Sequence, residues 1–242
     1  MLIGPYDHVG GQGYISSVPG GYTIDSVTNI EINEVAFDWF DYILKDSSKP
    51  EILKDKANYQ IMGANKWKHA PSLSAMNNDT LNLYLSNVRL GANYKLTTNP
   101  ENNQFIRQEI DFKDNTDTMQ PWGQTVVLDS TLNVSNGLPF VSQTFDKPFK
   151  INGAFIGTPM ASINKKDMDV SIALYKLKAD GTYFTLSNFL GRTSYAKDRS
   201  ERQLLMSGKI EAIPYSKLMF VSARINAGSK LVVVLGINKN QY

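Results

Sequence analysis

The alternation of hydrophobic and polar positions divides the chain into a short first part and a long second part. From about residue 57 onward, short apolar runs are separated by turn residues, with no helical pattern between them. In the run 168–177, Val170, Ile172 and Leu174 occupy alternate positions, which is the period of a half-buried strand. The runs that we expect to be strands are 59–63, 81–86, 124–128, 139–145, 149–157, 168–177, 182–191, 218–224 and 230–237. Many short strands at fairly even spacing predict a mainly β fold, a β-sandwich or jelly roll.

The first part of the chain combines a strand end, a loop and a helix. Residues 2–4 are typical of the end of a buried strand, and the loop 9–22 is too rich in glycine for a regular element. Apolar side chains then recur at helical spacing from about Asn33 to Lys45. We expect Trp39 and Phe40, on the apolar face of this helix, to be buried in a core.

Composition and charge exclude several classes of protein. Hydrophobic residues make up 42% and charged residues 20%, which is a globular composition. The formal net charge of +2 provides no electrostatic footprint for nucleic acid or an anionic membrane surface. No run approaches about 18 apolar residues, so we expect no membrane-spanning helix. The absence of cysteine excludes disulfides, thiolate metal ligands and a cysteine nucleophile.

The strongest chemical signal lies around the first of the two histidines. A strand, a turn that holds His8, a glycine-rich loop and an amphipathic helix follow one another. In α/β-hydrolases the triad runs Ser, then Asp or Glu, then His, with the histidine on a loop after the last strands. If His8 is that residue, the nucleophile and the acid precede residue 1, and the chain contains no G-x-S-x-G motif. The alternatives are an ordinary loop histidine at position 8 and a surface histidine without function at His69.

Several segments resemble, in family order, the motifs of the CocE/NonD hydrolases, the superfamily of cocaine esterase and X-Pro dipeptidyl-peptidase. Tyr6 stands where that family typically has tryptophan before the histidine. The Met62, Gly63 and Trp67 pattern is similar to the family's entry into its C-terminal domain. The segments that carry the resemblance are 2–8, 37–45, 59–70, 145–155, 167–181 and 224–240. They span almost the whole chain.

The resemblance implies a serine hydrolase of three parts, an α/β-hydrolase core, a helical cap and a C-terminal jelly roll of the galactose-binding-like type. Residues 1–57 would be the C-terminal remnant of the core, ending in a linker, and residues 58–242 would be a jelly roll truncated at its end. His8 would be the catalytic base, and Met1 an internal methionine. The implied partners are an N-terminal core and cap, in the same polypeptide or a separate chain. The implied substrate is a small ester, amide or peptide, with no cofactor and no metal.

Residues of the second part offer further candidates for a site. Trp122, Val127 and Leu128 align loosely with a loop that faces the acyl pocket in the family. Asp167 and Asp169 suggest a cation site, but no third acid lies at loop spacing, so a hydrogen-bonding role is the preferred interpretation.

Two other functions stay open. One is a separate jelly-roll module that binds carbohydrate or peptide, with Trp67 or Trp122 as a stacking platform. The other is a structural part that associates with a separately made N-terminal half or with itself through the face of Trp39 and Phe40. We expect the chain by itself to be inactive, because a base without a nucleophile forms no acyl-enzyme. The substrate and the cellular compartment are left open by the sequence.

Overall fold

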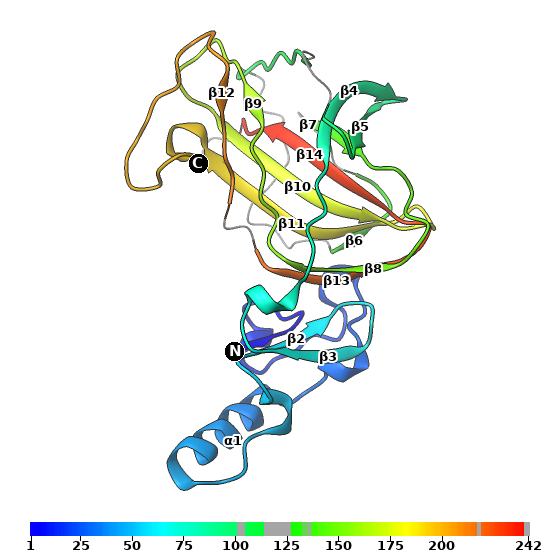
Figure 1. The fold of residues 1–242 in the computed structure, drawn as a ribbon, viewed down its shortest axis with the longest axis vertical. Coiled ribbons are helices and arrows are strands. Elements are labelled where there is room, and N and C mark those ends of the chain that lie inside the picture. Colours follow the sequence, from blue (N-terminus) through cyan, green and yellow to red (C-terminus); the bar gives the residue numbers. More distant parts are fainter. Residues whose placement is uncertain (101–104, 114–126, 133, 135–136, 217–218, 240–242) are drawn as a thin grey trace.

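The strands form two groups at different levels of an elongated molecule, and a helix projects beyond the smaller group (Figure 1). This arrangement comes from a computed structural model, which describes residues 1–100, 105–113, 127–132, 134, 137–216 and 219–239. The fold is mainly β, as the sequence predicts. No helix in these ranges is long and apolar enough to cross a membrane.

A seven-stranded sheet forms the larger group, in the order β4-β5-β7-β14-β10-β11-β6. Its strands are β4 (Tyr84–Leu90), β5 (Asn93–Thr97), β6 (Leu128–Asp129), β7 (Gly137–Val141), β10 (Asp169–Leu177), β11 (Tyr183–Arg192) and β14 (Lys230–Ile237). In β10, Val170, Ile172 and Leu174 are buried at alternate positions, so the predicted two-residue period is confirmed. The turn between β10 and β11 places Gly181 at a φ of 86°, a conformation that suits glycine.

A second layer covers one face of this sheet. It is an antiparallel ribbon of β8 (Phe149–Gly153) and β13 (Val221–Ile225). Val221, Ala223 and Ile225 of β13 pack against Leu174 and Phe184 of the sheet, and together they form the largest part of the core. A further short pair, β9 (Met160–Ala161) with β12 (Glu211–Ala212), lies near one end of the layers.

The smaller group is a three-stranded sheet in the order β1-β2-β3. Its strands are β1 (Leu2–Ile3), β2 (Ala57–Ile61) and β3 (Lys66–Ala70), with β1 parallel to β2 and β3 antiparallel to it. Helix α1 (Ile32–Lys45) lies below this sheet and agrees with the predicted helix to within one residue. Short 3₁₀ helices occupy residues 10–12, 19–21, 26–28, 51–53, 74–76 and 193–195.

Some of these strands differ from the predicted runs. The run 81–86 becomes β4 and starts three residues later, while the run 218–224 becomes β13. β3, β5, β9 and β12 were not predicted. The sequence of β3 has no apolar run, because lysines alternate with its other residues. β9 and β12 have two residues each, which is too few to show a period.

One carboxylate fastens the first part of the chain to the β2–β3 hairpin. The Oδ2 atom of Asp25 accepts hydrogen bonds from the Gln60 side chain, from the Gly63 N–H at 2.8 Å and from the Asn65 N–H at 3.2 Å. Gly63 has a φ of 77°, which favours glycine at this turn. Three donors on one oxygen hold residue 25 against the turn between β2 and β3.

Side chains of the hairpin return bonds to the same segment. The Oδ1 atom of Asn65 accepts from the Val27 N–H at 3.2 Å, and the indole N–H of Trp67 donates to the Val27 carbonyl at 2.7 Å. The hairpin is in turn tied to the larger group, because Met62 forms a parallel bridge with Ala223 of β13. Residues 25–28, β2–β3 and β13 are thus linked in series.

We expect Asp25→Ala to lower the free energy of unfolding by about 1–3 kcal/mol. The physical reason is that one side-chain donor and two main-chain donors lose their acceptor at a partly buried position. Urea unfolding followed by circular dichroism measures the change. Asp38→Ala, at an exposed position of α1, is the control. A loss for Asp25→Ala no larger than that of the control would show that the contacts at the turn contribute nothing.

Candidate functional site

His8 lies on a tight turn directly after β1. The Gly10 N–H donates to the Asp7 side chain at 2.6 Å, and the Gly11 N–H donates to the Asp7 carbonyl at 2.9 Å. Residues 10–12 then form a short 3₁₀ helix that ends at Gly13, with a φ of 101°. These local bonds hold the main chain on both sides of His8.

Tyr6 anchors the same turn to a distant segment. Its hydroxyl donates to the Thr28 carbonyl at 2.9 Å, and Thr28 is fully buried. Burial raises the pKa of Tyr6 to about 12, so the phenol keeps its proton. A Cβ on Gly4 would collide with the Tyr6 ring, so glycine is required beside it. Tyr6, which replaces the tryptophan of the family motif, therefore fastens the His8 turn to the segment that contains Thr28.

The imidazole of His8 faces solvent. Its Nε2 lies 3.2 Å from the Nε2 of Gln12, and the ring is exposed. In the part of the chain that the structure describes, no serine hydroxyl and no carboxylate is hydrogen-bonded to His8. A shallow hollow of about 170 Å³, which includes open solvent, lies next to the turn and is lined by Tyr6, Ile15 and Pro19 among others. The imidazole of His8 is therefore accessible to a side chain that does not belong to the described residues.

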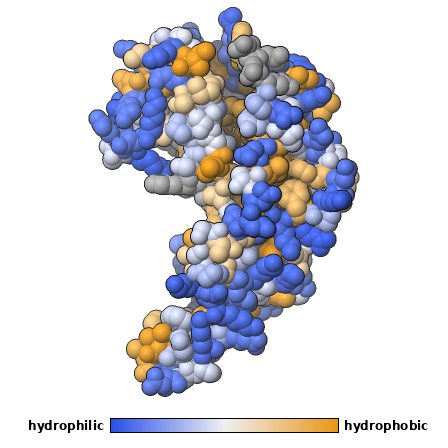
Figure 2. Space-filling view, viewed as in Figure 1, coloured by the Kyte–Doolittle hydropathy of each residue, from blue (hydrophilic) through white to orange (hydrophobic). Residues whose placement is uncertain are grey.

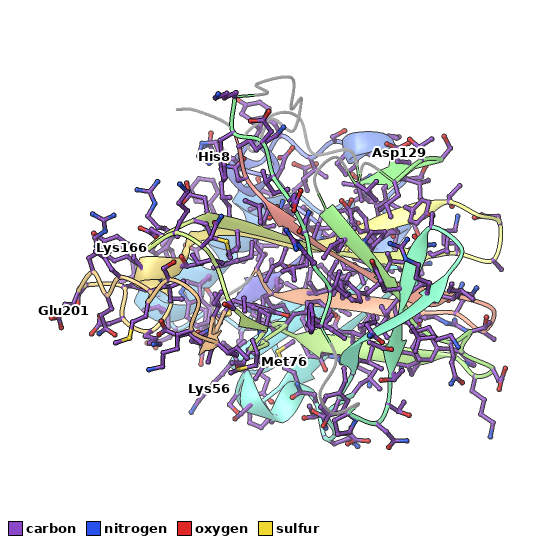
Figure 3. The ribbon with its side chains drawn as sticks, turned by 90° about the horizontal axis from the view of Figure 1, so that it is seen from above. His8, Lys56, Met76, Asp129, Lys166 and Glu201 are labelled. Atoms are coloured by element: carbon purple, nitrogen blue, oxygen red, sulfur yellow. The ribbon has the colours of Figure 1, made fainter. Side chains whose placement is uncertain are left out.

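Two of the three pocket candidates lie next to the glycine-rich loop. The Val127 N–H donates to the Gly20 carbonyl at 2.9 Å, and the Val127 carbonyl accepts from Thr185 at 2.8 Å. Val127 and Leu128 are half-buried and pack against the core that contains Phe184. In Figure 3, His8 and Asp129, the last residue of β6, lie toward the same edge of the view. Trp122 lies outside the described residues.

The loop itself also joins this region, through Tyr22. The ring of Tyr22 packs edge-on against Phe184 of β11, with ring centroids 4.9 Å apart. Burial and the nearby Asp25 carboxylate raise the pKa of Tyr22 to about 12. The glycine-rich loop that follows His8 is therefore held at Tyr22 against the seven-stranded sheet. Val127 and Leu128 pack against the same cluster.

Asp167 has the hydrogen-bonding role that the sequence favours over cation binding. Its carboxylate accepts from the Ser194 hydroxyl at 2.7 Å, the Thr193 hydroxyl at 2.9 Å and Arg202 at 3.1 Å. Asp169 forms a two-point ion pair with Arg192 at 2.7 and 3.0 Å. In the described ranges, no group of three acidic or histidine side chains could hold a metal ion.

The second histidine and one tryptophan are engaged in the fold. His69 is half-buried on β3, and its Nδ1 lies 2.8 Å from the Oδ1 of Asn58. Burial and the charge of Lys54 lower the pKa of His69. The indole N–H of Trp67 donates to the Val27 carbonyl, so this half-buried side chain helps to hold the segment 25–28.

The apolar face of α1 is exposed. Figure 2 shows a hydrophobic area on this projecting helix. Trp39 and Phe40, which we expected in a core, are 38% and 57% exposed, and Leu44 is 74% exposed. The other large apolar side chains of the area are Phe37 and Ile43. The expectation of burial is wrong for this chain by itself, because no described element packs over that face.

The sequence did not reveal two contacts of the site. The bond from Tyr6 to Thr28 and the bond from Val127 to Gly20 join residues far apart along the chain. Local patterns carry no signal for such pairs. The substitution of tyrosine for the family's tryptophan was the one available hint of a polar partner at position 6.

Comparison with known families gives one broad match. Residues 53–236 match the family model of the X-Pro dipeptidyl-peptidase C-terminal non-catalytic domain. His8 and α1 precede the matched range. A search among curated proteins found no match.

Solved structures share the fold. One is an aminopeptidase from a marine sediment Thaumarchaeota archaeon, with 18% identity and a TM-score of 0.73 over 98% of this chain and 41% of that chain. An α-amino acid ester hydrolase has 17% identity and a TM-score of 0.73 over 98% and 42%. A CocE/NonD family hydrolase from Staphylococcus aureus has 17% identity and a TM-score of 0.61 over 87% and 39%. The chain spans about two fifths of the length of these proteins. Together with the family match, they confirm the resemblance to the C-terminal portion of CocE/NonD hydrolases.

We expect Asp167→Asn to lower the free energy of unfolding at pH 7 by about 1–3 kcal/mol. Burial alone would raise the pKa of Asp167, but hydrogen bonds from Ser194, Arg202 and Thr193 outweigh it and lower the pKa from 3.8. A lowered pKa stabilises the fold above the unfolded value, and this contribution is lost as the pH falls through the folded value.

The measurement is urea unfolding at pH 7, 4 and 3. The wild type should lose stability below about pH 4 more steeply than Asp167→Asn. Asp38→Asn serves as the control, because that carboxylate is exposed on α1. Parallel pH profiles for the wild type and Asp167→Asn would contradict the expectation.

Proposed function

Because the chain belongs to the family of the X-Pro dipeptidyl-peptidase C-terminal non-catalytic domain, we propose that it is the C-terminal part of a serine hydrolase. The observation that carries the proposal is the exposed imidazole of His8 on a braced turn directly after β1. Residues 1–57 would complete an α/β-hydrolase core, and residues 58–242 would form a jelly roll beside it. The enzyme would cleave ester or amide bonds, and the removal of an X-Pro dipeptide is one such reaction.

In this proposal His8 is the general base. It accepts the proton of a serine hydroxyl that an N-terminal core supplies, and it later passes that proton to the leaving group. Such a base needs a fixed position and an open ring. The bonds of Asp7 and Tyr6 supply the fixed position, and the solvent-facing imidazole supplies access.

Two surfaces support an N-terminal core as the partner. The β1 strand is the edge of its sheet and runs parallel to β2, and in the described residues no strand pairs with its other side. Parallel strands of this kind are normally covered and extended in α/β proteins. The exposed face of α1 is the second surface, because an apolar area of this kind is normally covered by another element.

The β layers would form one wall of the substrate cleft. Val127 and Leu128 approach the glycine-rich loop from the larger group, so they lie beside the loop that follows His8. Their contribution would be apolar contact with the acyl group of the substrate. No cofactor is needed for this chemistry.

We expect the 242-residue chain to show no hydrolysis of a p-nitrophenyl ester or an X-Pro p-nitroanilide above the buffer rate, because His8 has no nucleophile to activate. In the enzyme expressed with its upstream coding sequence, His8→Ala should lower kcat on the order of 10⁴–10⁶-fold with little change in KM. Release of nitrophenol or nitroaniline measures both.

Gln12→Ala is the matched control, because it removes the neighbour of the imidazole but keeps the base. If the 242-residue chain hydrolyses these substrates and His8→Ala abolishes the activity, the proposal that the serine nucleophile comes from a separate N-terminal core is wrong. A stop codon and a ribosome-binding site directly before the Met1 codon would show that the cell makes this chain separately.

The exposed α1 face leads to a further expectation. At high concentration the 242-residue chain should self-associate, and Phe40→Glu with Leu44→Glu should keep it monomeric, because two charges on the apolar face would have to be buried. Light scattering measures the mass. Glu34→Gln with Asp38→Asn changes the net charge by two units in the opposite sense, away from the apolar face, and should leave the association intact. A wild-type chain that stays monomeric would contradict the expectation.

A further inference from the structure

Four cationic side chains gather where the two groups of strands meet. Lys66 and Lys68 lie on β3, Lys150 lies on β8, and Arg224 lies on β13. We call these four residues the basic cluster. The bridge between Met62 and Ala223 brings the hairpin that contains β3 next to the β8–β13 ribbon.

Strand pairing and the junction between the two groups of strands bring the four charges close together. Arg224 is directly opposite Lys150 in the ribbon, and both are exposed. Lys66 and Lys68 are two residues apart on β3, so they share a face of that strand. The charge of Lys68, together with slight burial and the charges of Lys66 and Arg224, lowers the pKa of Lys150. All of the charges that act on Lys150 in this way are positive.

The basic cluster brings four cations next to one another, and no carboxylate pairs with any of them in the described residues. Some other cations, namely Lys45, Lys54, Lys178, Lys197, Arg192 and Arg202, each have a carboxylate within ion-pair distance. Other exposed lysines, such as Lys165 and Lys166, form no ion pair in the described residues, but they do not face a cation on a paired strand. Within the described residues, no member of the basic cluster forms an ion pair. Like charges directly opposite each other on neighbouring strands destabilise a sheet. The cluster therefore has an electrostatic cost that no contact in the described residues offsets.

We propose that the basic cluster binds a carboxylate-rich, extended segment of another polypeptide. Alternate residues of an extended strand are about 6.6–6.8 Å apart, which is also the spacing of Lys66 and Lys68 along β3. A partner segment with Asp or Glu at every second position would match that spacing. The inference is independent of His8 and goes beyond the proposed hydrolase function.

The shape and the charge favour this partner over others. Small ligands bind in concave sites, whereas the hollow described above lies beside the His8 turn and none of the four cluster residues lines it. Nucleic acids are bound by larger basic surfaces on proteins of higher net charge, whereas this chain carries +2. Four neighbouring cations on paired strands, three of them exposed and Lys68 half-buried, are suited to a short acidic segment, held by electrostatic attraction that salt weakens.

The test uses fluorescein-labelled poly-L-glutamate as the probe and the 242-residue chain at about 50 mM salt. Fluorescence anisotropy should show binding that weakens at about 300 mM salt. Lys150→Gln with Arg224→Gln should weaken it at least about tenfold. The matched control is Lys165→Gln with Lys166→Gln, the same change of charge on the exposed segment that Figure 3 marks at Lys166. The control should weaken binding less than about twofold.

Stability provides a second readout. The substitutions at Lys150 and Arg224 should leave the melting temperature unchanged or raise it by about 1–2 °C at low salt, because they relieve repulsion. Loss of binding can then not be attributed to unfolding. Equal weakening in both double variants, absence of binding by the wild type, or tighter binding of single-stranded DNA of equal charge would each overturn the proposal.

Discussion

The position of the candidate site depends on the hydrogen bonds that the Asp25 carboxylate accepts. One oxygen takes a side-chain donor from β2 and two main-chain donors from the turn that follows. Hydrogen bonds to a charged acceptor are stronger than neutral ones, and they fix direction as well as distance. The segment 25–28 therefore cannot shift without breaking several bonds at once. That segment also contains Thr28, whose carbonyl holds Tyr6 and through it the turn of His8.

The same junction joins the small sheet to the large core. Met62 directly follows β2 and bridges to β13, whose side chains fill the space between the two β layers. The His8 turn is thus connected through Asp25 and β2 to the largest part of the core. Lys176 strengthens this region from within. Its ammonium is buried, donates to the Arg224 carbonyl at 3.2 Å and lies 4.6 Å from the centre of the Phe184 ring.

The surfaces left outside this framework differ in their chemistry. The face of α1 is apolar and lies at the far end of the molecule, so covering it would release water from hydrocarbon. The basic cluster is charged, so its interactions are long-range and sensitive to salt. Different partners suit them: a structural neighbour for the helix, and an acidic polypeptide for the strands.

Several features followed from local pattern, while others required the folded chain. The alternation in residues 168–177 and the helix at 32–45 were predictable, because each period is set by side chains a few positions apart. The buried side of β10 ends in Lys176, which a hydropathy pattern assigns to the surface. Its burial depends on a carbonyl and a ring supplied by β13 and β11.

By itself, the sequence determined the mainly β fold, the resemblance to its family and the choice of His8, since these depend on residue order and local period. The tertiary structure decided how His8 is held, which of the expected core residues are exposed, and that Lys66, Lys68, Lys150 and Arg224 meet on one surface. Contacts between residues tens of positions apart arise from strand pairing and packing, which no short stretch of sequence encodes.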